Sequence, residues 1–366
     1  CIGGRHKGRE RMVKPAVFDL VSQAHCSITY FVLFWSILFW FGGWLVAPLA
    51  LIVALACGVT ERKFLNKRLE QPPKNLAVVI TGCSSGFGYS LATRLANAGV
   101  TVFVGVRKQA DGEKVRAGTK QPENIHPIVC DVTNQEQIAE SAREVAETLE
   151  ASGRKLLALV NNAGYGEYSP IECIPLDRIR SQMEVNVVGL VGVTQAFVPL
   201  LRKYGPAGPL KPRVVNLSSG AGRISLPGAG IYSASKYAVE AISDALRVEL
   251  MPWGIHVLLV EPGRFHTEFQ NKAYSADNIN NEADMEDSVK NHYVKCMQTI
   301  NEHSASRSRP HMDHCVKTIE DSLMDTKPLA RYLAGTDVQF GIPVANHFPE
   351  YIKDLLLGGF WKTIKK

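Results

Sequence analysis

The chain alternates between short apolar runs and longer segments in which apolar residues recur with helical spacing. A short run without polar interruption is typical of a strand that is buried on both faces of a parallel sheet. Residues 76–80 form such a run, and further strand-like runs cover residues 101–106, 125–129, 156–160, 213–217 and 256–260. Helical spacing occupies the intervals, for example 135–152, 176–204 and 233–251. This alternation predicts an α/β fold, a doubly wound parallel sheet in a single domain, with ligands at the carboxyl ends of the strands.

A longer apolar run precedes this pattern, because residues 26–60 contain no charged side chain. About 20 apolar residues cross a bilayer, so the run is long enough for a transmembrane segment and too long for an ordinary signal peptide. Gly42, Gly43 and Pro48 are positions at which the run could bend, which leaves a single span and a hairpin as alternatives. A buried helix of the soluble domain is a third alternative, and the length of the run argues against it.

The run divides the chain into four parts. Residues 1–25 form a basic tail, 26–60 the membrane-spanning or hairpin segment, and 61–73 a linker that ends with a helix-breaking proline pair. The globular domain occupies residues 74–366. Basic residues lie on both sides of the apolar run, so the charge rule for membrane orientation gives no direction.

Composition argues against several classes of function. The net charge of the 366 residues is +6, and the basic residues form no dense stripe with aromatic neighbours, so no nucleic acid is expected as a partner. The eight cysteines are scattered without C-x-x-C pairs. We therefore expect reduced thiols, with neither a disulfide framework nor a metal site.

A glycine-rich turn follows the first expected strand. Thr81 leads into glycines at 82, 86 and 88, and a helical pattern through Leu91 comes after them. Glycine lets the backbone approach a pyrophosphate closely, and the unpaired N–H groups at a helix N-terminus face the anion. The turn therefore predicts a Rossmann-like dinucleotide site, with an ordinary strand–helix turn as the alternative.

The next two strand ends point to the nucleotide end of the same site. Arg107 follows the second strand, with no acidic residue before Asp111. A free ribose 2′-hydroxyl usually meets an acid here and a 2′-phosphate calls for arginine, so NADP is favoured over NAD; a solvated loop pair with Lys108 is the alternative. Asp131 follows the third strand, where it would accept a hydrogen bond from the adenine amine or cap the next helix.

Two further strand ends complete the expected cofactor site. The residues after the fourth strand are Asn162, Ala163 and Gly164. Side-chain amides there can tie neighbouring strand ends together, and the small residues leave room for a ribose. The residues after the sixth strand are Pro262, Gly263 and Thr267. Backbone and hydroxyl groups there would hold the carboxamide of nicotinamide.

Tyr232 and Lys236 lie one helical turn apart at the start of the expected helix 233–251. A nearby ammonium favours the phenolate of a tyrosine, whose pKa of about 10 otherwise makes it a poor acid–base at neutral pH. The tyrosine then exchanges a proton with an alcohol or carbonyl oxygen while hydride moves to or from nicotinamide. Ser219, at the end of the fifth strand, would hold the same oxygen. Asn186 lies inside a helical run, where it either permits a local kink or holds a water for a proton relay.

Taken together, these motifs closely resemble the short-chain dehydrogenase/reductase family. The matching positions are Thr81, Gly82, Gly86, Gly88, residues 161–164, Asn186, Ser219, Tyr232, Lys236, Pro262, Gly263 and Thr267. Within the family the chain is similar to the membrane-anchored retinol and hydroxysteroid dehydrogenases. The segments that carry this similarity are 80–83, 85–88, 222–225, 261–263 with Phe265 and Thr267, and 331–335. Ser84 is a departure, because the retinol enzymes commonly carry Asp there.

The resemblance implies a role for each matched residue. The catalytic set would be Asn186, Ser219, Tyr232 and Lys236. The cofactor-binding set would be Gly82, Ser84, Ser85, Gly86, Phe87, Gly88, Arg107, Asp131, Asn162, Ala163, Gly164, Tyr232, Lys236, Pro262, Gly263 and Thr267. Residues 264–312 lie where the family places its substrate lid, and a homodimer is expected from the family alone.

We therefore hypothesise an NAD(P)-dependent oxidoreductase that acts on a lipophilic alcohol or carbonyl of the hydroxysteroid or retinol class. A 3-hydroxy acid dehydrogenase, which shares much of the pattern, and a non-catalytic dinucleotide-binding protein are the alternatives. The apolar run predicts membrane lipid as a partner. The resemblance implies the endoplasmic reticulum, with the mitochondrial inner membrane as the rival. The C-terminal segment 351–366 is either a packed last helix or an amphipathic segment on a membrane surface.

Overall fold

A computed structural model describes residues 69, 72, 75–265, 286–306, 311–341, 349 and 351–355. All of them belong to the second of two units into which the chain divides, Arg68–Lys366. The expected basic tail and membrane segment, most of the expected linker and Thr267 lie outside the described residues.

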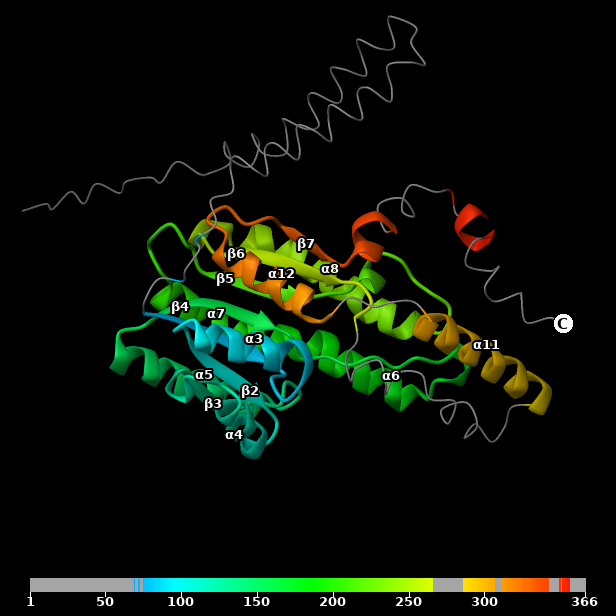
Figure 1. The fold of residues 1–366 in the computed structure, drawn as a ribbon, viewed down its shortest axis with the longest axis horizontal. Helices are drawn as coiled ribbons and strands as arrows, with labels where there is room; N and C mark the ends of the chain where they lie inside the picture. Colours follow the sequence, from blue (N-terminus) through cyan, green and yellow to red (C-terminus); the bar gives the residue numbers. More distant parts are fainter. Residues whose placement is uncertain are drawn as a thin grey trace, which may run out of the picture. The chain divides into compact units, whose positions relative to one another are not determined.

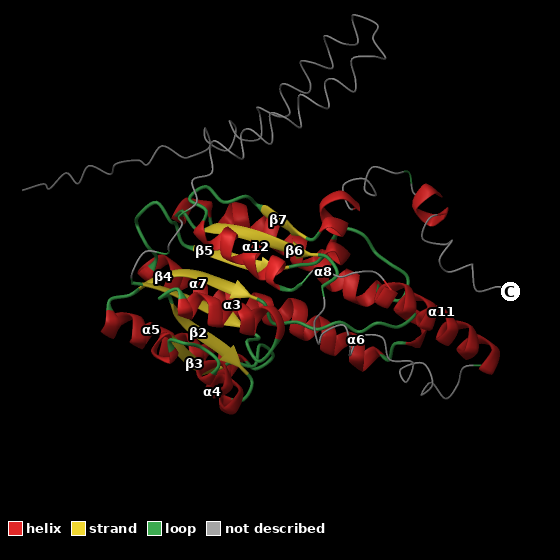
Figure 2. Cartoon of the chain, in the orientation of Figure 1, coloured by secondary structure: helices red, strands yellow, loops and turns green. Residues whose placement is uncertain are grey.

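The described part is built on a seven-stranded sheet in which every neighbouring pair of strands is parallel. The strands are β1 (Leu76–Thr81), β2 (Thr101–Val106), β3 (Ile125–Val129), β4 (Lys155–Asn161), β5 (Arg213–Leu217), β6 (His256–Pro262) and β7 (Arg331–Ala334). Their order is β3-β2-β1-β4-β5-β6-β7, visible as the yellow layer in Figure 2. The order reverses between β1 and β4, and ligands of doubly wound sheets bind at such a switch point.

Helices cover both faces of the sheet (Figure 1). On one face lie α3 (Gly86–Asn97), α4 (Gln109–Ala117) and α12 (Asp313–Met324). On the other lie α5 (Gln135–Ser152), α7 (Leu190–Tyr204) and α8 (Gly230–Glu249). Two more helices, α6 (Leu176–Met183) and α11 (Asp287–Ser306), extend beyond the carboxyl ends of the strands. The described part is therefore the three-layer α/β fold that the sequence predicts.

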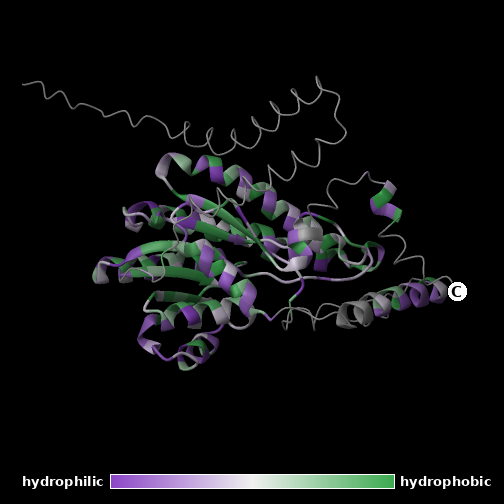
Figure 3. Ribbon diagram, turned by 45° about the horizontal axis from the view of Figure 1, so that its top comes forward, coloured by the Kyte–Doolittle hydropathy of each residue, from purple (hydrophilic) through white to green (hydrophobic). Residues whose placement is uncertain are grey.

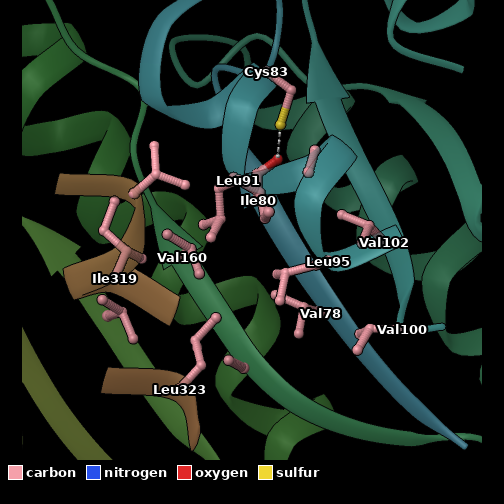
Figure 4. Close-up of a cluster of buried hydrophobic side chains, with 14 of the residues drawn as sticks. Val78, Ile80, Cys83, Leu91, Leu95, Val100, Val102, Val160, Ile319 and Leu323 are labelled. Carbon is pink, nitrogen blue, oxygen red and sulfur yellow. Dashed lines mark hydrogen bonds between the residues drawn. The ribbon is translucent and has the colours of Figure 1, made fainter. Parts of the chain in front are cut away.

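The strands lack polar alternation because both of their faces are buried. In β1, Val78 and Ile80 pack with α3 and α12, and Figure 4 shows them beside Leu91 and Leu323. Val79, between them in the sequence, packs with α5 and α7 on the opposite face. Figure 3 shows the same division, with apolar residues concentrated in the strands and mixed polarity on the helices. Each fully buried Val or Ile side chain contributes about 1.5–3 kcal/mol to folding.

The expected helix 176–204 is continuous but changes its pitch in the middle. A π-helical segment, η3 (Glu184–Gly189), joins α6 to α7. Among the described residues this is the one helix, Leu176–Tyr204, with the length and apolar composition of a membrane span, and half of its most apolar window is buried. Phe197 and Leu201 are fully buried in the core on the α5 face of the sheet. We therefore assign it as a core helix.

Candidate active site

The residues expected to carry the chemistry gather at the carboxyl ends of β1, β4, β5 and β6. The glycine turn after β1 approaches the end of β4 closely. Gly82 has φ +70°, and a Cβ built on it would lie 2.8 Å from Cα of Ala163. A Cβ on Gly88 would lie 2.5 Å from Nδ2 of Asn162. Glycine is therefore required at both positions, because a side chain on Gly82 would push the turn away from the end of β4, and one on Gly88 would push the start of α3 away from the turn and Asn162.

Gly86 meets a different environment. Its φ is +59°, and a Cβ there would meet no atom within 4 Å, so the turn is open on this side. Ser85, the N-cap residue of α3, makes no side-chain hydrogen bond to the helix, and Ser84 and Ser85 are exposed. An open space beside uncapped N–H groups fits the diphosphate of a dinucleotide. The residues present thus fit an NAD(P) cofactor.

Asn162 ties the ends of β1 and β4 together. Its Nδ2 donates to the carbonyl oxygens of Thr81 (2.8 Å) and Gly82 (3.0 Å). In return Oγ1 of Thr81 accepts from the backbone N–H groups of Asn162 and Ala163, both at 3.1 Å. The sequence-based expectation that amides here connect strand ends is confirmed.

Two neighbouring asparagines extend this connection across the sheet. Nδ2 of Asn161 donates to Oδ1 of Asn216 at 2.8 Å, and Asn216 donates to Ser243 of α8 at 2.8 Å. Asn161 and Asn216 are buried, so the chain of amides holds β4, β5 and α8 in register below the site.

The nucleotide end of the site contains Arg107 and Asp131. The side chain of Arg107 is exposed, and it forms no hydrogen bond or ion pair with any described residue. Oδ1 of Asp131 accepts from the N–H and the hydroxyl of Thr133, at 3.0 and 2.8 Å. The alternative that Asp131 caps the next helix is wrong, because Asn134 is the N-cap of α5 and accepts from the N–H of Gln137. The turn to Thr133 uses one carboxylate oxygen of Asp131.

Tyr232 lies in the first turn of α8, which begins at Gly230, earlier than the sequence predicts. Nζ of Lys236 lies 5.9 Å from the centre of the Tyr232 ring and donates a 2.8 Å hydrogen bond to the carbonyl oxygen of Leu217 on β5. Burial lowers the pKa of Lys236 to about 8, and the charge of Glu240 opposes that shift. At neutral pH the amine is still mainly an ammonium, the form that favours a phenolate nearby.

Ser219 follows β5 and is partly exposed. Its Oγ accepts from the N–H of Ala221 at 3.1 Å, which caps the short turn η4 (Gly220–Gly222). This bond uses the oxygen as an acceptor. The hydroxyl proton can therefore still be donated to a substrate oxygen.

Asn186 lies in the π-helical segment, so the expected irregularity at this position is confirmed. Its Oδ1 accepts from the N–H of Tyr165 at 3.0 Å, and its Nδ2 donates to the carbonyl of Tyr165 at 2.8 Å and to Oγ of Ser235 at 3.0 Å. Ser235 in turn donates to the carbonyl oxygen of Tyr232 at 2.7 Å. Asn186 therefore connects the loop after β4 to the turn that carries Tyr232. The relay water remains a prediction.

The loop after β6 is held by a residue that the sequence did not identify. The carboxylate of Asp337 lies directly against Gly263, where any side chain would overlap it, and accepts from the N–H of Arg264 at 2.9 Å. The N–H of Gly263 donates to the carbonyl of Ala334 on β7 at 2.7 Å. Pro262, the last residue of β6, is buried. This anchored turn sits where the nicotinamide end of the cofactor is expected.

An aromatic contact joins this loop to the glycine turn. The rings of Phe87 and Phe265 meet edge to face with their centres 5.7 Å apart. Phe265 is fully buried, whereas Phe87 is partly exposed. The contact therefore connects the two loops that flank the expected cofactor.

Apolar and aromatic side chains surround the ring of Tyr232. The ring of Tyr168 lies 5.3 Å from that of Tyr232, centre to centre. The members of this cluster from other elements are Cys173, Ala221, Ala229, Tyr293, Val294 and Met297. The last three belong to α11, which lies within the expected lid 264–312 and supplies its described helical part. Tyr168 was missed because it lies in a loop, where no periodicity marks it.

Comparison with known proteins agrees with this geometry. The family model for short chain dehydrogenase matches residues 76–278. Retinol dehydrogenase 16 of Rattus norvegicus is 33% identical over 311 residues, 83% of this chain and 94% of its own. 17-beta-hydroxysteroid dehydrogenase type 6 of Bos taurus is 32% identical over 319 residues, 86% of this chain and 97% of its own. A short-chain dehydrogenase structure from Streptomyces avermitilis has a TM-score of 0.62 at 28% identity and covers 80% of this chain and 98% of its own.

Proposed function

The chain belongs to the short-chain dehydrogenase family and is an NAD(P)-dependent oxidoreductase, and we propose that it interconverts an alcohol and a carbonyl on a lipophilic substrate of the hydroxysteroid or retinol class, with Tyr232 as the acid–base. One observation carries the proposal. The phenol of Tyr232 lies beside the Lys236 amine and within the apolar cluster to which α11 contributes. A proton-exchanging group in apolar surroundings suits an apolar alcohol.

Each residue has a defined task in this reaction. NAD(P), when bound, takes up a hydride from the alcohol carbon or supplies one to the carbonyl carbon. In oxidation the phenolate of Tyr232 removes the hydroxyl proton, and in reduction the phenol returns a proton to the carbonyl oxygen. Ser219 donates a hydrogen bond to the same oxygen. The ammonium of Lys236 stabilises the phenolate, and Asn186 positions the turn that carries Tyr232.

We propose NADP as the preferred cofactor. Arg107, at the end of β2, presents a guanidinium that has no partner among the described residues, and no acidic residue lies between it and Asp111. A guanidinium matches the charge and geometry of a ribose 2′-phosphate. The residues expected to hold the rest of the cofactor are those of the glycine turn and the ends of β4 and β6, together with Lys236.

We also propose attachment to a membrane, which the uncharged run 26–60 supports by its length. Tyr351 and Leu355, near the C-terminus, are 71% and 72% exposed, which suits contact with a lipid surface better than a packed last helix. The endoplasmic reticulum is the proposed location and a homodimer the proposed assembly; both rest on the family resemblance.

The test is turnover by the full chain purified in detergent. It is assayed with NADP or NAD and hydroxysteroids, retinol and 3-hydroxybutyrate. We expect steroid or retinoid turnover that Tyr232→Phe lowers about 100-fold or more, since acid–base catalysis contributes at least that much. Tyr237→Phe, an exposed tyrosine on the same helix, is the matched control and keeps activity.

Three results would overturn the proposal. Full activity of Tyr232→Phe would remove the mechanism. Saturation by 3-hydroxybutyrate but not by steroids or retinol would favour the 3-hydroxy acid alternative. Cofactor binding without turnover of any alcohol or carbonyl would favour the non-catalytic alternative.

A further inference from the structure

Three residues to which the proposed reaction assigns no role meet at one point on α8. Arg223 follows η4, Glu261 lies in β6, and Arg331 begins β7; all three surround Glu240. Nε of Arg331 lies 3.2 Å from Oε2 of Glu240 and 3.3 Å from Oε1 of Glu261. Nη1 of Arg223 lies 3.9 and 3.6 Å from the same two oxygens. Two carboxylates thus share two guanidinium groups.

The two carboxylates of the cluster are buried, whereas Arg223 and Arg331 are 34% and 28% exposed. The side chain of Glu240 is 9% exposed and that of Glu261 is 1% exposed. Neither carboxylate oxygen of Glu261 accepts a hydrogen bond from a described residue, whereas Oε2 of Glu240 accepts one from Arg331. Glu240 is therefore the better-held anion of the two. Burial raises the pKa of both carboxyl groups, and for Glu261 burial, followed by the charge of Glu240, raises it to about 7.

Glu240 also lies on the catalytic face of α8. Tyr232, Lys236 and Glu240 follow one another at intervals of four residues, so they lie one above the other about one turn apart. Lys236 is buried away from water, and its one hydrogen bond among the described residues goes to a neutral carbonyl. The charge of Glu240 is the one that raises the pKa of Lys236 against the effect of burial.

We propose that Glu240 is a positioning residue for the reaction: held by Arg223 and Arg331, its carboxylate keeps Lys236 in the ammonium form that Tyr232 needs. The proposal rests on the roles proposed above for Tyr232 and Lys236. Glu240 touches neither substrate nor cofactor and acts through Lys236. A buried carboxylate one turn below a buried amine stabilises the amine's charge, and that charge in turn favours the phenolate.

The charged groups that face Glu240 come from four elements. They are Arg331 on β7 and Arg223 after η4, which contact it, Glu261 on β6, which shares both guanidinium groups with it, and Lys236 and Asp244, which lie one turn away on either side of it in α8. Asp244 contacts Nη2 of Arg331 at 2.6 Å and Nη1 of Arg247 at 2.6 Å, and its side chain is 43% exposed. Asp244 thus shares a partner with Glu240 but lies one turn further from Lys236.

The decisive variant is Glu240→Gln, which removes the charge and keeps the shape. We expect the rising limb of the pH profile of kcat/KM for alcohol oxidation to move upward by about one unit, which is about a tenfold loss of rate at neutral pH. A second readout needs no cofactor. The ultraviolet absorbance of the Tyr232 phenolate, obtained as the difference from a Tyr232→Phe background, should appear at higher pH in the variant.

Matched variants separate charge from packing. Glu240→Asp keeps the charge and should shift the profile less than Glu240→Gln. Asp244→Asn loses a contact with the same arginine and should leave the profile in place. Glu261→Gln removes the competing carboxyl and should not move the limb upward, because Glu240 then holds both guanidinium groups alone. If Glu240→Gln does not fold, Glu261→Gln and Arg331→Gln are compared instead. Arg331→Gln should shift the rising limb of the pH profile upward, whereas Glu261→Gln should not.

Two results would overturn the inference. One is a Glu240→Gln protein whose kinetic profile and phenolate titration match those of the wild type. The other is an equal upward shift in Glu261→Gln or Asp244→Asn, which would indicate a general loss of packing. Failure of the proposed function looks different, because the wild-type chain itself would then turn over no alcohol, and the absorbance titration would still test Glu240.

Discussion

The hydroxyl group of Tyr293 on α11 donates a 2.6 Å hydrogen bond to Oε2 of Glu172, in the turn η2 (Ile171–Cys173). This bond joins α11, the described helix of the expected lid, to the loop after β4, and both ends lie next to the cluster around Tyr232. The hydrogen bond to Glu172, followed by burial, raises the pKa of Tyr293 to about 12. The phenol therefore remains a donor throughout the working pH range, and the contact between α11 and η2 persists.

Loss of this bond should weaken substrate binding more than chemistry. A hydrogen bond contributes about 1 kcal/mol net, so Tyr293→Phe should raise KM about fivefold with little change in kcat. Steady-state kinetics with a turned-over steroid or retinoid measures both constants. Glu172→Gln and the double variant complete a cycle, in which the two effects should not add. Additive effects, or a fall in kcat alone, would show that the bond does not hold α11 against η2.

The glycine turn should not tolerate a methyl group at Gly88. Its Cβ would overlap Nδ2 of Asn162 and the carbonyl oxygen of Gly82, and backbone atoms cannot move aside cheaply. Gly88→Ala should weaken NADPH binding about tenfold or more, because overpacking costs about 1–3 kcal/mol. Fluorescence titration with NADPH measures the Kd. Gly208→Ala, where a Cβ would meet no atom within 4 Å, is the control, and equal binding by both variants would contradict the prediction.

Arg107 should determine the choice of cofactor. Arg107→Asp replaces a guanidinium by a carboxylate, which repels a 2′-phosphate and accepts from a 2′-hydroxyl. The ratio of NADH to NADPH affinity should rise about tenfold or more, since a hydrogen bond to a charged group contributes about 1.5–3 kcal/mol. Lys120→Asp makes a similar charge change at an exposed site after α4 and should leave the ratio unchanged. An unchanged ratio in Arg107→Asp would remove the reason for preferring NADP.

Glu261 should make stability fall as pH rises. Its pKa is about 7 in the folded chain and near 4.5 in the unfolded chain, so folding takes up a proton between these values. Over that window stability decreases with rising pH, by up to about 3 kcal/mol at pH 7 and above. In Glu261→Gln the free energy of unfolding should depend less on pH. The difference in stability between variant and wild type should therefore favour the variant more at pH 8 than at pH 5. Melting temperatures of both proteins at the two pH values measure it, and parallel curves would contradict the prediction.

Much of the fold follows from local patterns. All six expected strands are present with bounds that differ by at most two residues, and α5 spans the expected 135–152. β7 was not expected, because its four residues begin with a charged arginine and are too short to show a period. Arg331 is tolerated there since it pairs with carboxylates on α8 and β6, contacts between segments far apart in the chain.

The candidate site likewise contains residues that the sequence identifies and residues that only the structure brings to notice. The residues with fixed local spacing, Tyr232 with Lys236 and the glycine turn, could be identified from the sequence. Glu240, Asp337 and Tyr168 could not, because nothing in their own neighbourhoods distinguishes them from ordinary helix or loop residues. Their roles come from what packs against them.

The order of residues along the chain thus determined the α/β layers and the candidate acid–base pair, since strand burial and helical spacing are properties of a few consecutive residues. Only the tertiary structure decided which guanidinium groups hold Glu240, which turn contacts α11 and which glycines lie against a neighbouring strand end. These depend on segments that meet once the sheet is assembled, and charge and steric overlap act through space rather than along the chain.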